Sequence, residues 1–241
     1  MKKILIITTM LLVFIGGTVF GSTYKIMTEE YPPYNYSVKG KLTGLSYDVV
    51  KVILQRIGHP DNIKKLPWSR SYNIIQNKKG YMLFSMTRTK EREKMFKWVG
   101  PVASNKWVFF AKKGSNLKIR SLNDAKKVKK VGTYKDDATE AYLKGKGFNN
   151  LKSVINDDLN VKLLMAGRIN LWITGELQGF HKVKAQGMST STIKKVFTVK
   201  NTQLYIAFSK GTPNKDIRKW QKALDSMKKD GTYKKIVKKY M

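Results

Sequence analysis

Short apolar strands alternate with amphipathic helices along this chain, and this alternation constrains its fold more than any other feature. The expected strands lie at 24–28, 63–66, 81–85, 107–111, 129–131, 153–155, 171–174 and 204–208, and the expected helices at 45–57, 71–76, 137–145, 159–165, 215–229 and 232–240. Such alternation is typical of α/β lobes with mainly parallel sheets. The pattern restarts after residues 112–114, which predicts a lobe boundary there.

Loops beyond the carboxyl ends of parallel strands are the usual place for a ligand. Tyr31, Thr87, Tyr134 and Glu176 fall at such ends. They are therefore candidate binding residues before any relative is considered.

The first 21 residues have the pattern of a cleaved secretory signal peptide. Lys2 and Lys3 precede an apolar run over 4–15, and Val19 and Gly21 are small enough for signal-peptidase recognition. The alternative is an uncleaved membrane anchor, but the run is shorter than the roughly 20 apolar residues that a spanning helix needs. We expect the mature chain to begin near Ser22.

Cysteine is absent from the sequence, which excludes disulfides, thiolate metal sites and a cysteine nucleophile. It also excludes the cysteine to which a lipid anchor would be attached. An exported protein without an anchor is retained only inside an outer membrane, so we expect the protein to be periplasmic.

The net charge of +32, or +30 (32 − 2) without the two signal-peptide lysines, raises the question of a polyanionic partner. The cations are mostly lysines spread over the whole chain, and no known nucleic-acid-binding signature accompanies them. We expect a lysine-rich surface that adheres to polyanions at low salt, and no specific nucleic-acid partner.

Six segments carry a further signal through their order. They are Tyr31-Pro32-Pro33-Tyr34, 44–50 (GLSYDVV), 86–92 (MTRTKER), Val131-Gly132-Thr133, 166–170 (AGRIN) and 229–236 (KDGTYKKI). Each is weak alone, but together they span nearly the whole mature chain. In this order they resemble family 3 of the bacterial extracellular solute-binding proteins, the group that contains the polar-amino-acid receptors of ABC importers.

The resemblance implies a two-lobed periplasmic-binding-protein fold, in which each lobe is a central sheet flanked by helices and two crossovers form a hinge. Lobe 1 would be 22–112 plus 200–241, and lobe 2 would be 113–199. A small carboxylate-bearing solute, an amino acid or a similar molecule, would bind in the cleft and be buried by hinge closure. The expected partner is the membrane permease of an ABC importer, and we expect a monomer without cofactor or metal.

Three residues of lobe 1 match the family positions that bind the carboxylate and amine of a ligand. Arg92 resembles the arginine that clamps the carboxylate, since a planar guanidinium can bind it through two hydrogen bonds. Thr87 resembles the hydroxyl that shares this carboxylate, and Ser85 the position whose backbone carbonyl accepts from the amine. The alternatives are a surface arginine paired with Glu91 or Glu93, and ordinary loop capping for Ser85 and Thr87.

Four more residues match contact positions of the family. Tyr31 and Trp68 correspond to the aromatic pair that encloses the ligand side chain, although core packing is an almost equal alternative for Trp68. Thr133 and Tyr134 fall at a helix N-terminus that favours the carboxylate. The alternative for Thr133 is that it caps this helix.

The sequence departs from the amino-acid-binding pattern in lobe 2. The acid that holds the ligand ammonium is replaced by Gly175, with Glu176 one residue later. Glu176 is therefore the candidate amine partner, and an α-amino group on the ligand is in doubt.

A secreted enzyme is the main alternative, because cyclohexadienyl dehydratases resemble these binding proteins. Its general acid or base would have to be His59, His181 or Glu176. We expect both histidines at the surface and therefore expect a binder and not an enzyme.

Overall fold

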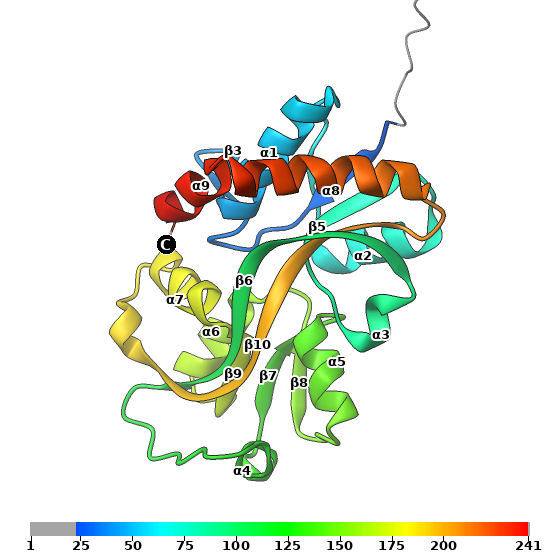
Figure 1. The fold of residues 1–241 in the computed structure, drawn as a ribbon. Coiled ribbons are helices and arrows are strands. Elements are labelled where there is room, and N and C mark those ends of the chain that lie inside the picture. Colours follow the sequence, from blue (N-terminus) through cyan, green and yellow to red (C-terminus); the bar gives the residue numbers. More distant parts are fainter. Residues whose placement is uncertain (1–22, 241) are drawn as a thin grey trace, which may run out of the picture.

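The computed structural model of the protein describes residues 23–240 (Figure 1). The expected signal peptide at 1–21 lies outside the described residues. None of the helices within the described residues is both long enough and apolar enough to cross a membrane.

The upper half in Figure 1 is built on three parallel strands. β1 (Lys25–Thr28) pairs with β5 (Tyr81–Thr87) on one side and with the short β4 (Lys64–Lys65) on the other. The same half contains α1 (Leu45–Ile57), α2 (Trp68–Asn77), α3 (Lys90–Glu93) and the hairpin of β2 (Tyr36–Val38) and β3 (Lys41–Thr43).

The lower half in Figure 1 repeats this arrangement with β7 (Val131–Tyr134) between β8 (Leu151–Val154) and β9 (Leu171–Gly175), all parallel. Its helices are α4 (Leu122–Lys127), α5 (Ala138–Gly145), α6 (Asp158–Met165), α7 (Glu176–Ala185) and the short η1 (Thr190–Thr192). The chain then returns, and α8 (Asn214–Lys229) and α9 (Thr232–Tyr240) cover the upper half.

Two 17-residue strands, β6 (Phe96–Lys112) and β10 (Ile193–Ser209), run through both halves as an antiparallel pair (Figure 1). At one end β10 pairs with β5, and at the other β6 pairs with β9. The result is one eight-stranded sheet in the order β4-β1-β5-β10-β6-β9-β7-β8. The parallel parts expected from the sequence are thus joined by a central antiparallel pair.

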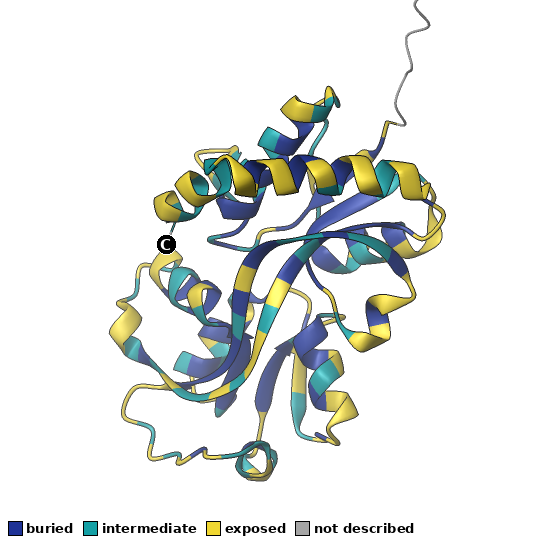
Figure 2. Ribbon diagram, viewed as in Figure 1, coloured by how far each residue is buried: buried dark blue, intermediate teal, exposed yellow. Residues whose placement is uncertain are grey.

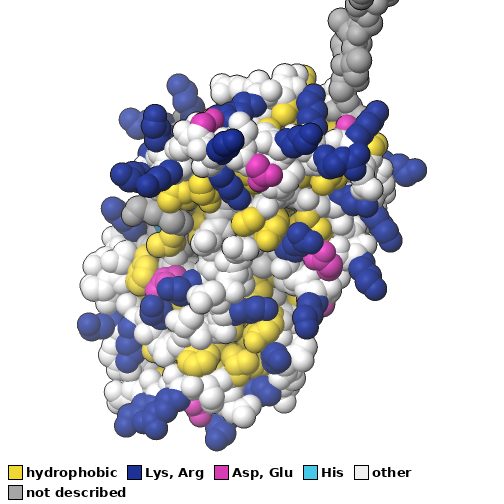
Figure 3. Space-filling view, viewed as in Figure 1, with side chains coloured by type: hydrophobic (Ala, Val, Ile, Leu, Met, Phe, Trp, Pro, Cys, Tyr) yellow, Lys and Arg dark blue, Asp and Glu magenta, His cyan; other side chains and the backbone are white. Residues whose placement is uncertain are grey.

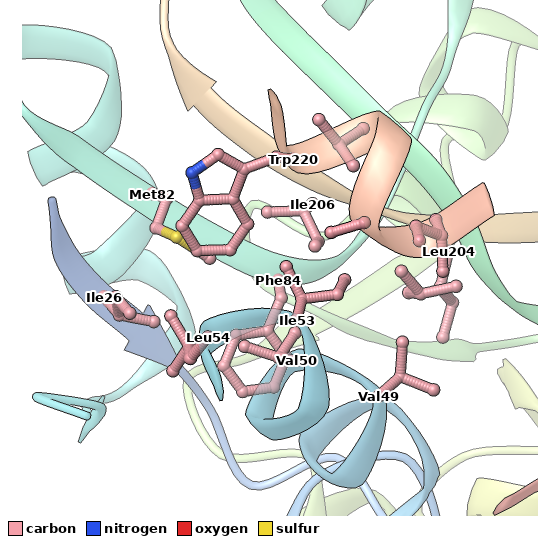
Figure 4. Packing of buried hydrophobic residues seen from close by; sticks show 14 of the residues in the cluster. Ile26, Val49, Val50, Ile53, Leu54, Met82, Phe84, Leu204, Ile206 and Trp220 are labelled. Atoms are coloured by element: carbon pink, nitrogen blue, oxygen red, sulfur yellow. The ribbon is translucent and has the colours of Figure 1, made fainter. Parts of the chain in front are cut away.

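Each half has its own apolar core. Figure 4 shows the upper one, where Val49, Val50 and Ile53 of α1 lie in one apolar cluster with Trp220 of α8. In the lower half Phe109, Phe110 and Trp172 are fully buried. Burial of one such side chain contributes roughly 1.5–3 kcal/mol, so both clusters stabilise the fold. Figure 2 shows this burial along the sheet, with exposed residues on the outer faces of the helices.

The division into lobes at 22–112 plus 200–241 and 113–199 remains a proposal. Trp107 to Phe110 pair with β9 of the lower half, so the first crossing lies closer to Asn105 than to Lys112. The second crossing lies on β10 opposite it, where Asn201 pairs with Lys106. We propose these two points as the hinge.

Candidate functional site

The two halves face each other across the carboxyl ends of their parallel strands. A cavity of about 340 Å³ lies there, and both halves line it. The upper half supplies Glu29, Glu30, Lys65, Leu66, Pro67 and Trp68, and the lower half supplies Tyr134, Ile155, Asn156, Asp157, Asp158 and Lys182. This volume lies in the range of small-molecule sites.

Arg92 is buried beside this cavity, with 5% of its surface exposed. Its guanidinium lies 4.7 Å from the ring centre of Tyr72 and 5.2 Å from that of Trp68. One Nη donates to the carbonyl of Thr87 at 3.5 Å, and the other to the carbonyl of Asp136, in the lower half, at 3.1 Å. Arg92 is therefore a buried cation in contact with two aromatic rings, with a donor directed across the cleft.

The surface-arginine alternative for Arg92 is wrong. Glu93 instead accepts two hydrogen bonds from Arg88, one of them at 2.7 Å, on the exposed side of the loop. Arg88 also lies over the rings of Trp98 and Tyr205, so it is a partly packed surface residue.

Trp68 shares the contact that Arg92 makes. It is the first residue of α2 and is 2% exposed, and its indole Nε1 donates to the Asp136 carbonyl at 3.0 Å. Asp136 has a φ of 61°, a conformation that non-glycine residues seldom adopt outside tight turns. Two donors of the upper half thus converge on one carbonyl oxygen of the lower half.

Ser85 and Asn35 fix the loop that follows β1. Ser85 has a φ of 65° and its hydroxyl donates to the side-chain oxygen of Asn35. The amide of Asn35 then donates to the Glu29 carbonyl at 2.8 Å. The hydroxyl of Ser85 therefore takes part in a local hydrogen-bond network. The group of Ser85 that the resemblance assigns to the ligand amine is its backbone carbonyl.

Tyr31 contacts the hinge. Its hydroxyl accepts from the Asn105 amide at 2.7 Å, and its ring packs on Tyr34 with 5.2 Å between ring centres. A Cβ added at Gly175 would lie 3.3 Å from the Tyr31 hydroxyl and 2.8 Å from the Asn105 side-chain oxygen. Gly175 therefore allows the end of β9 to approach this pair closely.

Thr133 and Tyr134 end β7 at the cleft. The hydroxyl of Thr133 donates to Glu140 at 3.3 Å, and the N-cap of α5 is Asp137, so the capping alternative for Thr133 is wrong. Tyr134 lines the cavity and hydrogen-bonds the carboxyl of Glu29. Burial and the nearby Glu29 raise the pKa of the Tyr134 hydroxyl, so it remains a neutral donor.

Glu29 is a buried acid in the cleft. It is 8% exposed, and desolvation, followed by repulsion from Asp137, raises its pKa from 4.5 to about 8. Lys182, opposite it, and the hydrogen bond from Tyr134 oppose this shift. Glu29 is therefore mostly protonated near neutral pH in this structure.

Asp157 is the second buried acid in the cleft, 4% exposed. Its carboxylate accepts from Asn160 at 2.8 Å and from the Trp172 indole at 3.0 Å. Desolvation nevertheless raises its pKa. These neutral donors hold Asp157 in place beneath the cavity.

Glu176 lies apart from this group. Its carboxylate accepts from Lys195 and forms an ion pair with Lys106 at 3.3 Å, and these lysines lower its pKa. It lines a different cavity of about 840 Å³ on the hinge strands, together with Thr87, Arg88, Lys106, Lys200 and Tyr205 among others. Glu176 is therefore engaged by two lysines at the hinge.

The structure brings Arg92, Trp68 and Tyr134 together at the cleft, with Tyr31 and Ser85 in the adjoining loops. It does not bring Glu176 to them.

Sequence reasoning missed four residues that complete the cleft, namely Glu29, Asp136, Asp157 and Lys182. A signal existed for the first three, since each follows the end of a strand by one to three residues. Lys182 gave none, because it is one lysine of many.

Comparison with known proteins agrees with this geometry. The model of "Bacterial extracellular solute-binding proteins, family 3" matches residues 24–241. The L-cystine-binding protein TcyA of Bacillus subtilis is 25% identical over 217 residues, which cover 87% of this chain and 77% of that protein. A probable amino-acid ABC transporter-binding protein of Haemophilus influenzae is 25% identical over 264 residues, which cover 98% of this chain and 96% of that protein.

Among solved structures, an ancestral arginine-binding protein bound to arginine is similar with a TM-score of 0.80. It is 28% identical and covers 92% of this chain and 99% of that one. The expected α/β periplasmic-binding-protein fold is thereby confirmed. The chain belongs to family 3 of the bacterial extracellular solute-binding proteins.

Proposed function

We propose that the protein captures a small amino acid or similar carboxylate-bearing solute between its two lobes and presents it to the permease of an ABC importer. The observation that carries the proposal is the cavity of about 340 Å³ lined by both lobes beside the buried Arg92. A solute that touches both lobes favours their closure by the difference between its affinities for the closed and open forms.

Arg92 is the proposed carboxylate clamp. Its two Nη donors now meet the neutral carbonyls of Thr87 and Asp136. A carboxylate offers two charged acceptors in the plane of the guanidinium, and charge-assisted hydrogen bonds are about twice as strong as neutral ones. The solute would therefore compete well for these donors, with the Thr87 hydroxyl as a second donor.

Tyr31, Trp68 and Tyr134 are the proposed walls of the site, and Ser85 and Thr133 supply polar groups at the strand ends. Trp68 is already buried, and Tyr31 and Tyr134 are half-buried. Hydrogen bonds from Trp68 and to Tyr31 fix two of the three rings. Such preorganised walls lose little conformational entropy when a solute binds. Glu176 stays a candidate amine partner only if its lysine contacts are exchanged on binding.

The surroundings of His59 and His181, two of the candidate general acids or bases, give less support to the dehydratase alternative. The Nε2 of His59 accepts from the Tyr24 N–H at 2.9 Å, and its ring stacks on Tyr24 and makes an edge-on contact with Trp220. His181 packs against Tyr36, and burial lowers its pKa. Incubation with prephenate or arogenate tests this alternative directly, since formation of the aromatic product would establish it.

The periplasm is the proposed location, because the expected signal peptide and the family both belong to exported proteins. Mass spectrometry of small molecules released from the protein after purification from a periplasmic extract tests the binding function. We expect a carboxylate-bearing solute near one molecule per protein. If no solute is released, and no amino acid raises the melting temperature of the protein, the proposed function is wrong.

A further inference from the structure

Positive charge is concentrated on the two C-terminal helices. Residues 214–240, which form α8 and α9, contain ten lysines and arginines and three acids, an excess of seven (10 − 3) in 27 residues. The whole chain has an excess of 32 in 241 residues, so these helices carry about twice the average charge density. Figure 3 shows Lys and Arg side chains projecting from the upper half, where Figure 1 has these helices. The ten cations are all exposed and define the α8–α9 surface: Lys215, Arg218, Lys219, Lys222, Lys228, Lys229, Lys234, Lys235, Lys238 and Lys239.

Half of these cations form a row along α8, on the face opposite the core. Trp220, Leu224 and Met227 of α8 are buried in the core of the upper half. Because an α-helix turns once every 3.6 residues, residues spaced by three, four and seven positions share one face. The five cations with this spacing lie on the face away from Trp220, in a row about 21 Å long at a rise of 1.5 Å per residue. They are Lys215, Arg218, Lys219, Lys222 and Lys229.

The protein itself supplies few counter-ions for this surface. Among residues 23–240, Lys239 is the only one of the ten cations that takes part in an ion pair, which it forms with Asp48. The three acids of the two helices accept hydrogen bonds from other side chains, namely Tyr24 to Asp216, Gln221 to Asp225 and Arg56 to Asp230. Like charges on one helix face repel each other. An anionic surface opposite the row would remove this repulsion.

The α8–α9 surface lies apart from the solute cleft. Both helices cover the outside of the upper half (Figure 1). None of their residues lines the cavity of about 340 Å³ or the cavity of about 840 Å³. The exposed large hydrophobic residues of the described chain also lie outside these helices, at Val38, Met95, Ile155, Leu159 and Leu177. A partner of this surface would therefore be held by charge, without insertion of apolar side chains, and would leave the lower half free to move.

We propose that the α8–α9 surface docks the protein on an anionic phospholipid membrane, through attraction between its cations and the lipid phosphates. At physiological ionic strength, salt limits such attraction to charges within about 8 Å of the lipid. The cations of a straight helical face can all come this close to a plane at once, whereas cations spread around a curved surface cannot. Each lysine or arginine near an anionic membrane adds to the affinity. Phospholipid is favoured over nucleic acid because the family is extracellular.

Sedimentation with lipid vesicles tests this inference, which does not depend on the identity of the solute. The mature protein is mixed, at about 150 mM salt, with vesicles of phosphatidylcholine that contain about 30% phosphatidylglycerol or none. We expect binding to the anionic vesicles alone. Replacement of the five cations of the α8 row by glutamine should weaken this binding about tenfold or more. Glutamine is as good a helix former as lysine or arginine, so the circular dichroism of the variant should match that of the wild type.

The segment 112–130 of the lower half provides the matched control. It contains eight lysines and arginines and one acid, also an excess of seven (8 − 1), but its only helix is the six-residue α4. The control variant replaces five of its exposed cations by glutamine, again four lysines and one arginine, and should bind the anionic vesicles within about threefold of the wild type. The five are Lys113, Lys118, Arg120, Lys127 and Lys129.

Three results would overturn the inference. If both variants lose affinity equally, net charge and not the α8–α9 surface governs binding. If the wild type does not bind the anionic vesicles at this salt concentration, or binds the neutral ones as well, the surface does not recognise anionic lipid. Wild-type protein that binds duplex DNA but no vesicles under the same conditions would show that the surface fits a different polyanion.

Discussion

Removal of the Glu29 carboxyl should change how the stability of the protein depends on pH. Because its pKa in the folded state is about 8 and its ordinary value is 4.5, the folded protein binds an extra proton between these values. The contribution of Glu29 is therefore fully present below about pH 4.5 and is lost as the pH rises through 8. Over the difference of about 3.5 units, at about 1.4 kcal/mol per unit, the loss reaches roughly 5 kcal/mol.

Urea denaturation of the wild type and of Glu29→Gln at several values from pH 5 to pH 8 measures this effect. Glutamine cannot ionise, so the variant should become more stable than the wild type by several kcal/mol as the pH rises. Burial lowers the pKa of His181, so the stability that this residue contributes to the protein is lost as the pH falls below about 6.5. Because His181 is present in both proteins, this contribution cancels in the difference between them.

Glu176→Gln is the control for this experiment. The lysines at positions 106 and 195 lower the pKa of Glu176, so its contribution is lost only on acidification below about pH 4.5. The difference between the wild type and this variant should be flat from pH 5 to pH 8. If the Glu29→Gln difference is equally flat, within about 1 kcal/mol, the carboxyl is not desolvated and the reasoning about the cleft is wrong.

Other variants test the proposed contacts. Arg92→Ala should weaken binding of the solute by about two to four decades, the cost of breaking a buried ion pair, and Arg92→Lys should recover little because lysine lacks the planar fork. Arg88→Ala, which removes the surface pair with Glu93 and the contacts with the rings of Trp98 and Tyr205, should bind within about threefold of the wild type by titration calorimetry. Gly175→Ala should lower the thermal midpoint by an amount equivalent to about 1–3 kcal/mol, because the new Cβ meets the Asn105 side chain; an unchanged midpoint would show that the hinge has room.

Local sequence signals predicted the helices and strands that bury one apolar face against a core. The apolar spacing over 45–57 predicted α1, and Gly58, with a φ of 65°, ends it. The sequence underestimated β6, because Gly100-Pro101 and the polar run 104–106 look like a turn. These polar residues lie where the strand crosses between the lobes, and Asn105 is buried there by contact with Tyr31 and Tyr34, to which it is hydrogen-bonded.

Helix α7 was missed for a different reason. It contains Gly179 and four charged or imidazole side chains, so neither propensity nor apolar spacing marks it as a helix. A Cβ at Gly179 would lie 2.2 Å from the ring of Phe110, so the glycine is needed for close packing on the sheet. Tertiary contact decides this element, and a local pattern could not reveal it.

The candidate site was predictable where a motif fixes the position and unpredictable where two lobes meet. The loop of Arg92 and the strand end at Tyr134 follow from order in the sequence. The convergence of Trp68 and Arg92 on the Asp136 carbonyl depends on how the lobes approach each other. The environment of Glu29 also depends on that approach, since its carboxyl hydrogen-bonds Tyr134 of the other lobe.

Small-angle scattering tests the central claim, that a solute bound between the lobes holds them together. The protein freed of solute by denaturation and refolding is compared with the same protein saturated with the solute that it releases or with the amino acid that binds best. The account predicts a smaller radius of gyration with solute, approaching that of the structure in which Trp68 and Arg92 bridge the lobes. An unchanged radius at a concentration where calorimetry shows saturation would contradict it.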